Sequence, residues 1–187
     1  NPDWTDQTTV NYLKLIQLFF GLGLFITPIL LYAYFTDFKF KFKWLTRQNT
    51  ILIIAIMMLI LPFIALLLEW NMRILPDWIL RFDENYDIAA TEFLKMYNIW
   101  DFSYTILVIA IIPAIGEELL FRGYLQQKTT KWFKSPHTAI LLTAFLFSVI
   151  HLHLQGILPR FILGILLGYL YFWSDNLWAP ILAHFVH

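Results

Sequence analysis

Long stretches without charged side chains divide this chain into predicted membrane-spanning helices. Leu15–Thr36, Gln48–Leu68 and Ser135–Pro159 contain no Lys, Arg, Asp or Glu, and Phe102–Gly116 is a further uncharged stretch. A helix needs about 20 predominantly apolar residues to cross the hydrocarbon core of a bilayer. The pattern therefore predicts an all-α fold, a polytopic transmembrane helical bundle of about six spans. We expect these helices over residues 10–35, 50–68, 102–127, 137–153, 158–173 and from about 177 onward.

The composition agrees with a membrane protein and removes several other classes. Of the 187 residues, 59% are hydrophobic and 14% are charged, and the mean hydropathy is +0.64. Soluble domains are about 45–50% apolar and about 25% charged. The formal net charge is zero, so no basic face is offered to a nucleic acid. The chain has no Cys, which excludes disulfides and thiolate chemistry. The lipid bilayer is the first expected partner.

The charged loops predict how the spans are oriented. The segment Asp37–Arg47 alternates basic and aromatic residues, and Lys128, Lys131 and Lys134 follow the third predicted helix. By the positive-inside rule both segments mark the cytoplasmic side. Residues 69–101 carry more acidic than basic side chains, and we assign them to the outer side. We interpret the membrane as a bacterial plasma (inner) membrane.

The same loops divide the chain into two regions. Within residues 69–101, Ala89, Phe93, Met96 and Trp100 recur at helical spacing, which predicts an interfacial helix lying flat on the membrane. Residues 1–101 then hold two N-terminal transmembrane helices and this acidic outer loop, and residues 102–187 hold a core of four transmembrane helices. The first residues show no signal-peptide pattern, and we expect the natural chain to continue beyond His187.

Two carboxylates and a guanidinium interrupt the third predicted helix. The motif Gly116-Glu117-Glu118-Leu119-Leu120-Phe121-Arg122 directly follows the uncharged stretch. An ionisable group at the bilayer centre costs roughly 2.5–3.5 kcal/mol on insertion scales, so such groups usually face a cavity or one another. Glu118 precedes Arg122 by four residues, the favourable order for a helical ion pair. Glu117 points about 100° away and has no sequence-local partner, which makes it a candidate general base.

Two histidines lie at a matching depth on other predicted helices. A rise of 1.5 Å per residue places Glu117, His151 and His184 about 10–21 Å from the ends of their helices. We therefore expect these three side chains to converge in a pocket that opens towards the cytoplasm. A carboxylate with two imidazoles suits water activation, either by direct general-base catalysis or around a zinc ion.

The remaining histidines have structural interpretations. His153 stands two residues from His151, about 200° around a helix, so both cannot face one pocket, and we assign His153 to the boundary. His187 can share the face of His184, either as a further ligand or as a polar helix end. His137 is assigned to the interface. A membrane histidine can also serve only as a hydrogen-bonding group between helices.

The three motifs stand in one order along the chain. Glu-Glu-x-x-x-Arg at 117–122, Phe-x-x-x-His at 147–151 and a final His at 184 fall on successive predicted helices. In this order the chain resembles the CPBP family, intramembrane proteases that include the type II CAAX prenyl endopeptidases and bacterial bacteriocin-processing or self-immunity relatives. The resemblance covers about residues 102–187, the four-helix CPBP core. The signatures of site-2, presenilin-like and rhomboid proteases are absent.

The resemblance implies an activity and a role for each motif residue. Glu117 would activate water, His151 would help to bind the water or a metal, and His184 would stabilise the oxyanion. Supporting roles fall on Glu118, Arg122 and Phe147. In the family an Asn or Asp follows the last His by four residues, a position beyond the end of this sequence. The resemblance implies an intramembrane endopeptidase for a membrane-associated or lipidated peptide, with a zinc-dependent or a metal-free mechanism.

A second class of function stays open. The same fold can serve as a non-proteolytic membrane partner, such as an immunity, scaffold or assembly subunit that binds another membrane protein. Complementation in vivo by a Glu117→Ala protein would favour that alternative. A proton or ion pathway also uses buried Glu and His, but the sequence shows no paired inverted segments.

Overall fold

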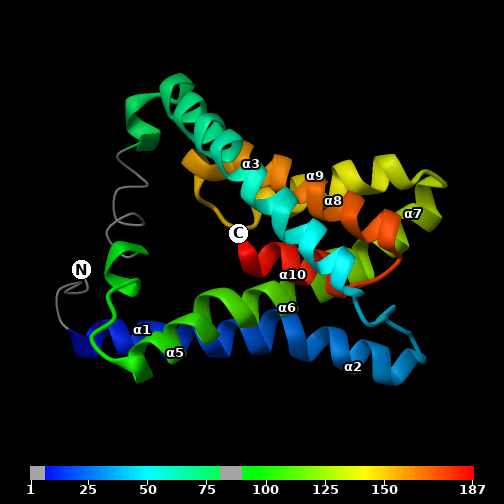
Figure 1. The fold of residues 1–187 in the computed structure, drawn as a ribbon, viewed down its shortest axis with the longest axis horizontal. Helices are drawn as coiled ribbons and strands as arrows, with labels where there is room; N and C mark the ends of the chain where they lie inside the picture. Colours follow the sequence, from blue (N-terminus) through cyan, green and yellow to red (C-terminus); the bar gives the residue numbers. More distant parts are fainter. Residues whose placement is uncertain (1–6, 81–89) are drawn as a thin grey trace.

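The computed structural model describes residues 7–80 and 90–187, and this part of the chain forms helices without a strand (Figure 1). Several helices join end to end through π-helical segments, labelled η. The elements are α1 (Gln7–Phe20), η1 (Gly21–Ile26), α2 (Thr27–Thr36), α3 (Arg47–Ile74), α5 (Ile99–Ile106), η2 (Leu107–Ile111), α6 (Ile112–Glu118), η3 (Leu119–Leu125), α7 (Gln126–Phe133), α8 (Pro136–Val149), a 3-10 turn η4 (Leu154–Gly156), α9 (Ile157–Ser174) and α10 (Trp178–Val186). The predicted all-α fold is confirmed.

The described residues contain four helical segments that are long and apolar enough to cross a membrane. These are Gln7–Thr36, Arg47–Ile74, Ile99–Phe133 and Leu154–Ser174. The other two predicted spans are present as shorter apolar helices, α8 with 14 residues and α10 with 9 residues. Large apolar side chains such as Tyr34, Leu59 and Trp100 are exposed on the bundle. A bilayer covers such a surface, and the chain is a helical membrane bundle.

Polar caps explain where several helices begin and end. The side chains of Thr46, Asn98 and Ser135 accept hydrogen bonds from backbone N–H groups at the starts of α3, α5 and α8. Such caps satisfy donors that have no partner within the helix. At the other ends, Lys134 after α7 and Asp175 after α9 adopt left-handed backbone angles, with φ of 53° and 46°. This conformation stops a helix.

The helices predicted over 50–68 and 102–127 are longer in the structure, as Arg47–Ile74 and Ile99–Phe133, and two other predicted elements are shortened or interrupted. The fourth helix was expected over 137–153, but α8 ends at Val149 and Leu152 has φ of 52°. The apolar pattern continues through residues 150–153, where the chain reverses direction, so hydrophobic periodicity alone could not locate the end of the helix. The interfacial helix expected over 89–100 is broken, because residues 90–93 are helical and residues 95–97 are not. Its first residue, Ala89, lies outside the described residues, and its place on the membrane stays a prediction.

Helix α10 lies at the centre of the bundle, between the α5–α6 segment on one side and α3 and α9 on the other (Figure 1). One apolar core joins α3, α9 and α10 and includes Met57, Leu167 and Ala183, which are fully buried. The α1–η1 segment runs beside α5–α6, and the buried Lys14 Nζ donates to Thr105 Oγ1 at 2.8 Å between them. The histidine-bearing helix α10 is therefore packed on several sides.

Close contact between α8 and α9 depends on two glycines. A Cβ atom at Gly164 would lie 3.0 Å from Ala144 Cα, and one at Gly168 would lie 2.8 Å from Ile140 Cγ2. Small residues four apart allow helices in a membrane to approach closely. The carbonyls of Gly164 and Gly168 also accept hydrogen bonds from Arg122 and Gln126. Helix α9 therefore fixes the position of η3 and α7.

The loop after α2 is bound to the turn between α9 and α10. Lys43 N donates to Asn176 Oδ1 at 3.0 Å, and Asn176 Nδ2 donates to Lys43 O at 2.7 Å. Leu177 N donates to Lys41 O at 2.8 Å. The predicted regions 1–101 and 102–187 are thus connected at the base of α10, and the boundary between them falls inside α5.

Candidate active site

Glu118 connects the helix that carries it to α10. Its Oε1 atom lies 2.6 Å from Arg122 Nη1 and 2.9 Å from His184 Nδ1. The side chains of Glu118 and Arg122 are 0% and 1% exposed, and Arg122 Nη2 donates to Gly164 O at 3.0 Å. The network therefore joins α6, η3, α9 and α10 around one buried ion pair.

The three residues predicted to converge do lie together. Glu117 Oε2 is 3.8 Å from His151 Nε2 and 4.0 Å from His184 Nε2. Among the described residues none donates a hydrogen bond to Glu117 Oε2. Both separations are too long for a direct hydrogen bond. A contact of this length is one that a bridging water can span.

Hydrogen bonds at the far nitrogens orient both imidazoles. His151 Nδ1 lies 2.7 Å from Phe147 O. A carbonyl only accepts, so Nδ1 carries the proton and Nε2 of the neutral ring presents a lone pair to Glu117. His184 Nδ1 faces the carboxylate of Glu118, which likewise accepts. Both Nε2 atoms therefore point towards Glu117.

The ring of Phe147 contacts both histidines of the site and two further residues. Its ring is buried and lies 5.1 Å from the ring of His151, 5.8 Å from that of His184 and 5.3 Å from that of Phe121. The guanidinium of Arg122 lies over the same ring at 4.7 Å. Aromatic and cation–π contacts favour these geometries. The structure thus brings together all six predicted site residues.

A pocket of about 470 Å³ opens beside Glu117 and His151. Its wall is mostly apolar and comes from α1, η1, η2, α6 and the segment before α5. The lining includes Phe20, Phe25, Ala90, Phe93, Leu94, Ile109, Pro113 and Ile150. A mainly apolar cavity with a few convergent polar groups is the usual form of a binding site.

The pocket lies on one side of Glu117 along the helix, and its expected opening towards the cytoplasm stays a prediction. It extends from Glu117 towards residues 90–94, the segment assigned to the outer side, and away from Lys128 and Lys131 at the end of α7. Glu117 lies near the middle of the 35-residue segment Ile99–Phe133. Depth along the helix therefore could not indicate towards which end the pocket would open.

Sequence reasoning missed three polar residues that bind the segment between α8 and α9. Asn71 Nδ2 in α3 donates to Leu154 O at 3.0 Å and to Gln155 O at 2.6 Å. Ser148 Oγ donates to Ile157 O, and Arg160 Nη1 donates to His153 O at 2.9 Å. A non-helical segment within a membrane needs such partners for its carbonyls. The signal in the sequence was a single Asn and a single Arg beside long apolar stretches.

The other histidines have different surroundings. His153 is 8% exposed and its Nδ1 lies 2.6 Å from Arg160 Nη2, and its assignment to the membrane boundary stays a prediction. His137 Nδ1 lies 2.8 Å from Tyr169 Oη on an exposed face. His187 is exposed at the end of α10, and a ligand role for it stays a prediction.

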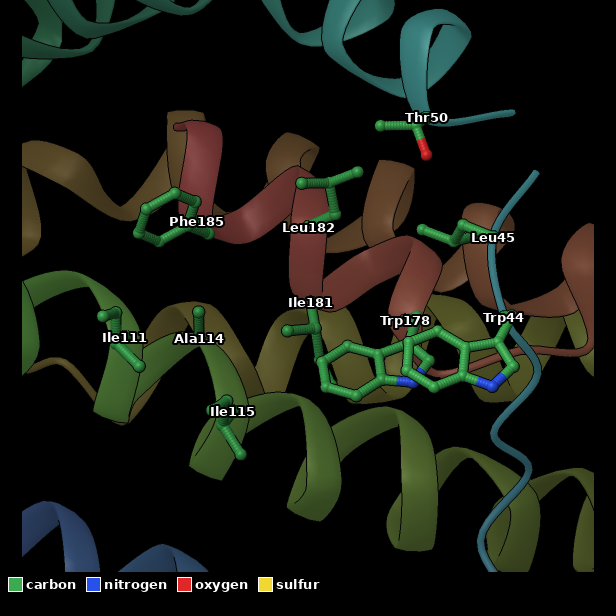
Figure 2. Close-up of a pocket in the computed structure, with 10 residues that line it drawn as sticks. All are labelled: Trp44, Leu45, Thr50, Ile111, Ala114, Ile115, Trp178, Ile181, Leu182 and Phe185. Atoms are coloured by element: carbon green, nitrogen blue, oxygen red, sulfur yellow. The ribbon is translucent and has the colours of Figure 1, made fainter. Parts of the chain in front are cut away.

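A second cavity, of about 530 Å³, lies between the α5–α6 segment, α10 and the start of α3. Figure 2 shows Ile111, Ala114 and Ile115 on one wall and Ile181, Leu182 and Phe185 of α10 on another. Trp44 and Trp178 lie at one end. At helical spacing this wall of the α5–α6 segment is a different face from that of Glu117. The cavity contains none of the predicted site residues.

The Glu117 carboxylate and the imidazole nitrogens of His151 and His184 suit zinc in type. In the described part of the chain, however, no group of three or more His, Cys, Asp or Glu side chains has the arrangement that holds a metal ion. The side chains as placed do not fit a metal.

Comparison with known proteins matches the C-terminal part of the chain. Residues 99–187 match the family model described as type II CAAX prenyl endopeptidase Rce1-like. The chain is 31% identical over 85 residues to "Uncharacterized protein YpbD" of Bacillus subtilis (strain 168), covering 43% of this chain and 40% of that protein. It is 32% identical over 83 residues to "Putative membrane peptidase YdiL" of the same organism, covering 42% and 32%. The matched region thus spans less than half of each relative.

No solved structure matches the chain. The matched residues include Glu117, His151 and His184 together with the helices that carry them. Most of the site therefore lies in the matched region, whereas α1, η1 and α3 lie before it. Residues 99–187 of this membrane protein are similar to the Rce1-like type II CAAX prenyl endopeptidase family, which is consistent with the resemblance to the CPBP family.

Proposed function

We propose that the chain is an intramembrane endopeptidase that hydrolyses a peptide bond of a membrane-associated or lipidated peptide. The observation that carries the proposal is the position of Glu117 Oε2, 3.8 Å from His151 Nε2 and 4.0 Å from His184 Nε2, at the edge of an apolar pocket. The family match supports hydrolysis as the class of reaction.

A water molecule between Glu117 and His151 would satisfy both residues. The carboxylate oxygen and the His151 Nε2 lone pair are both acceptors, and water has two O–H donors. In the reaction Glu117 takes one proton as the water oxygen attacks the scissile carbonyl carbon. The same carboxyl then delivers that proton to the leaving amine nitrogen, so the proton balance closes.

His184 is proposed to stabilise the tetrahedral oxyanion. Glu118 accepts the hydrogen bond from Nδ1, and the proposed role requires that Nε2 also carries a proton. Nε2–H is then available as a donor towards the pocket. A donor that faces the developing negative charge in a water-poor site stabilises the transition state. Arg122 holds Glu118 in place for this role.

The pocket wall indicates the class of substrate. Phe20, Phe25, Phe93 and Ile109 make it apolar, so we propose that apolar side chains or a lipid group flank the scissile bond. If the basic segments at 37–47 and 128–134 face the cytoplasm, the side near residues 90–94 faces outward. A pocket that opens towards the cytoplasm, as expected from the sequence, would instead require the opposite orientation of the chain, with residues 90–94 on the cytoplasmic side. Since the chain has no Cys, single cysteines at Met96 and Lys131 and an impermeant thiol reagent can determine the orientation.

A zinc-dependent mechanism is the other form of the same proposal. Glu117, His151 and His184 would have to adopt another arrangement than the one described to hold the ion, which would supply activation of the bound water. Metal analysis of the purified protein separates the two forms.

The test uses the full chain in liposomes with a library of lipidated and membrane-spanning peptides. Mass spectrometry of new peptide termini measures hydrolysis. We expect Glu117→Gln and His151→Ala each to lower the rate by about 10²–10⁴-fold, because general-base catalysis contributes that much. Glu69→Gln, which changes an exposed carboxylate on α3, is the matched control. Hydrolysis by Glu117→Gln at the wild-type rate would overturn the role of Glu117, and a wild-type protein that cleaves no peptide would leave the non-proteolytic partner.

A further inference from the structure

The segment between α8 and α9 places His151, yet it is not helical. Residues 150–153 reverse the chain, with φ of 52° at Leu152, and η4 follows. His151 therefore depends on contacts outside its own helix for its orientation. One of these is the hydrogen bond of its Nδ1 to Phe147 O, and the others act on the residues after it.

Arg160 holds that segment from the first turns of α9. Its Nη1 donates to His153 O at 2.9 Å and its Nη2 donates to His153 Nδ1 at 2.6 Å. The planar guanidinium thus binds both the backbone and the ring of one residue. Two parallel hydrogen bonds from a guanidinium fix an orientation as well as a distance. His153 stands only two residues from His151, so this contact limits how the reversal can move.

Gly156 provides the space for this guanidinium. A Cβ atom at Gly156 would lie 2.6 Å from Arg160 Nη2, 2.7 Å from Cζ and 2.9 Å from Nη1. Gly156 has φ of −96°, a value that alanine also adopts. Glycine is therefore needed at this position because Arg160 approaches closely, and not because of the backbone angle.

Arg160 also brings a positive charge to the site. Glu118 is paired with Arg122, and the Arg122 guanidinium also acts electrostatically on Glu117. The guanidinium of Arg160 is close enough to interact electrostatically with Glu117 and His151. With it, the site holds two carboxylates and two guanidiniums. Charges within a membrane protein are stabilised by such balance.

We propose that Arg160 is a positioning residue, which holds His151 towards Glu117 by binding His153. The effect of Arg160 on the rate of hydrolysis rests on the proposed function. Its effect on the conformation of the segment between α8 and α9 does not depend on that function. Asn71 in α3 supports the same segment through the carbonyls of Leu154 and Gln155.

The first experiment measures kcat and KM for Arg160→Gln, Arg160→Lys and Gly156→Ala in liposomes. We expect kcat to fall by about 100-fold in Arg160→Gln, the loss typical of a small misplacement of a reacting group, while KM stays within about twofold. Arg160→Lys keeps the charge without the paired hydrogen bonds and should recover part of the loss. Gly156→Ala keeps the guanidinium but displaces it, and should also lower kcat. Arg73→Gln, which changes an exposed arginine on α3, should leave both constants unchanged.

The second experiment needs no substrate. Hydrogen exchange followed by mass spectrometry reads the protection of backbone amides at residues 150–157. Protection should fall in Arg160→Gln and Gly156→Ala and stay at the wild-type level in Arg73→Gln. Unchanged protection in both site variants, or a wild-type kcat in Arg160→Gln, would overturn the proposal for Arg160. A wild-type protein without hydrolytic activity would instead refute the proposed function, while the exchange result would still decide whether Arg160 holds the segment.

Discussion

The buried pair of Glu118 and Arg122 shows how single residues determine this site. Both side chains are almost fully inaccessible, so each charge depends on the other for its stability. Glu118 also accepts a hydrogen bond from His184. One carboxylate therefore pairs with a cation on its own helical segment and also orients a side chain of a second helix.

Replacing Glu118 by Gln should be costly because it leaves the Arg122 guanidinium buried without a counter-charge. Breaking one partner of a buried ion pair costs about 3–5 kcal/mol. We expect this loss in reversible unfolding in detergent. Glu69→Gln breaks an exposed pair with Arg73 and should cost about 0–1 kcal/mol. Equal effects of the two substitutions would contradict the buried network.

Much of the residue-scale site could be predicted from the sequence. Charged residues in an apolar helix are rare, so Glu117, Glu118 and Arg122 could be recognised as candidates. His151 and His184 were added because they lie at a matching depth along their own predicted helices. Arg160 and Asn71 could not be predicted in the same way. Their partners are backbone carbonyls and a histidine in the segment where the chain reverses direction between α8 and α9. The hydrophobic pattern of the sequence does not indicate such a segment.

At the scale of elements, the glycines of α9 decide how closely α8 approaches. Substituting Gly164 by Ala would place a methyl group 3.0 Å from Ala144 Cα, a backbone atom that cannot rotate away. We expect a loss of about 1–3 kcal/mol, as for overpacked interiors, measured by the same unfolding assay. Gly23→Ala is the matched control, since nothing lies within 4 Å of its added Cβ. A neutral Gly164→Ala protein would show that the helices separate without cost.

Helix boundaries were predicted best where capping residues accompany the change of hydropathy. Thr46, Ser135 and the left-handed Asp175 mark ends that lie close to the expected ones. The π-helical segments η1, η2 and η3 had no such signal. An added residue in a helical turn does not change the apolar pattern, although it changes which face each later side chain occupies.

At the scale of the whole molecule, the loop after α2 and the turn before α10 connect the two halves of the chain. Lys41 Nζ lies 2.6 Å and Lys43 Nζ lies 3.5 Å from the Asp175 carboxylate. The residues matched by the family model begin at 99, so this contact joins a region outside the match to the helix that carries His184. The N-terminal half is therefore part of the site's support.

The pH dependence of stability should report this contact. The hydrogen bond from Lys41, with a smaller contribution from Lys43, holds the pKa of Asp175 below its ordinary value of 3.8. A lowered folded-state pKa gives stability that is complete above the unfolded pKa and is lost as the pH falls through the folded pKa. Asp175→Asn should thus be less stable than wild type at pH 7, by at most about 1 kcal/mol for so exposed a pair. The difference should shrink as the pH falls below 3.8 and through the lowered pKa of Asp175. A difference that is independent of pH would contradict the ion pair.

The central claim is that Glu117 and His151 act on one water molecule. The most direct measurement is kcat/KM for Glu117→Gln, His151→Gln and the double variant, with the same peptide in liposomes. Residues that act as a unit have strongly non-additive effects. We predict that the double variant is no slower than the slower single variant. A double variant whose loss equals the product of the two single losses would show that the residues act independently, and would contradict the account.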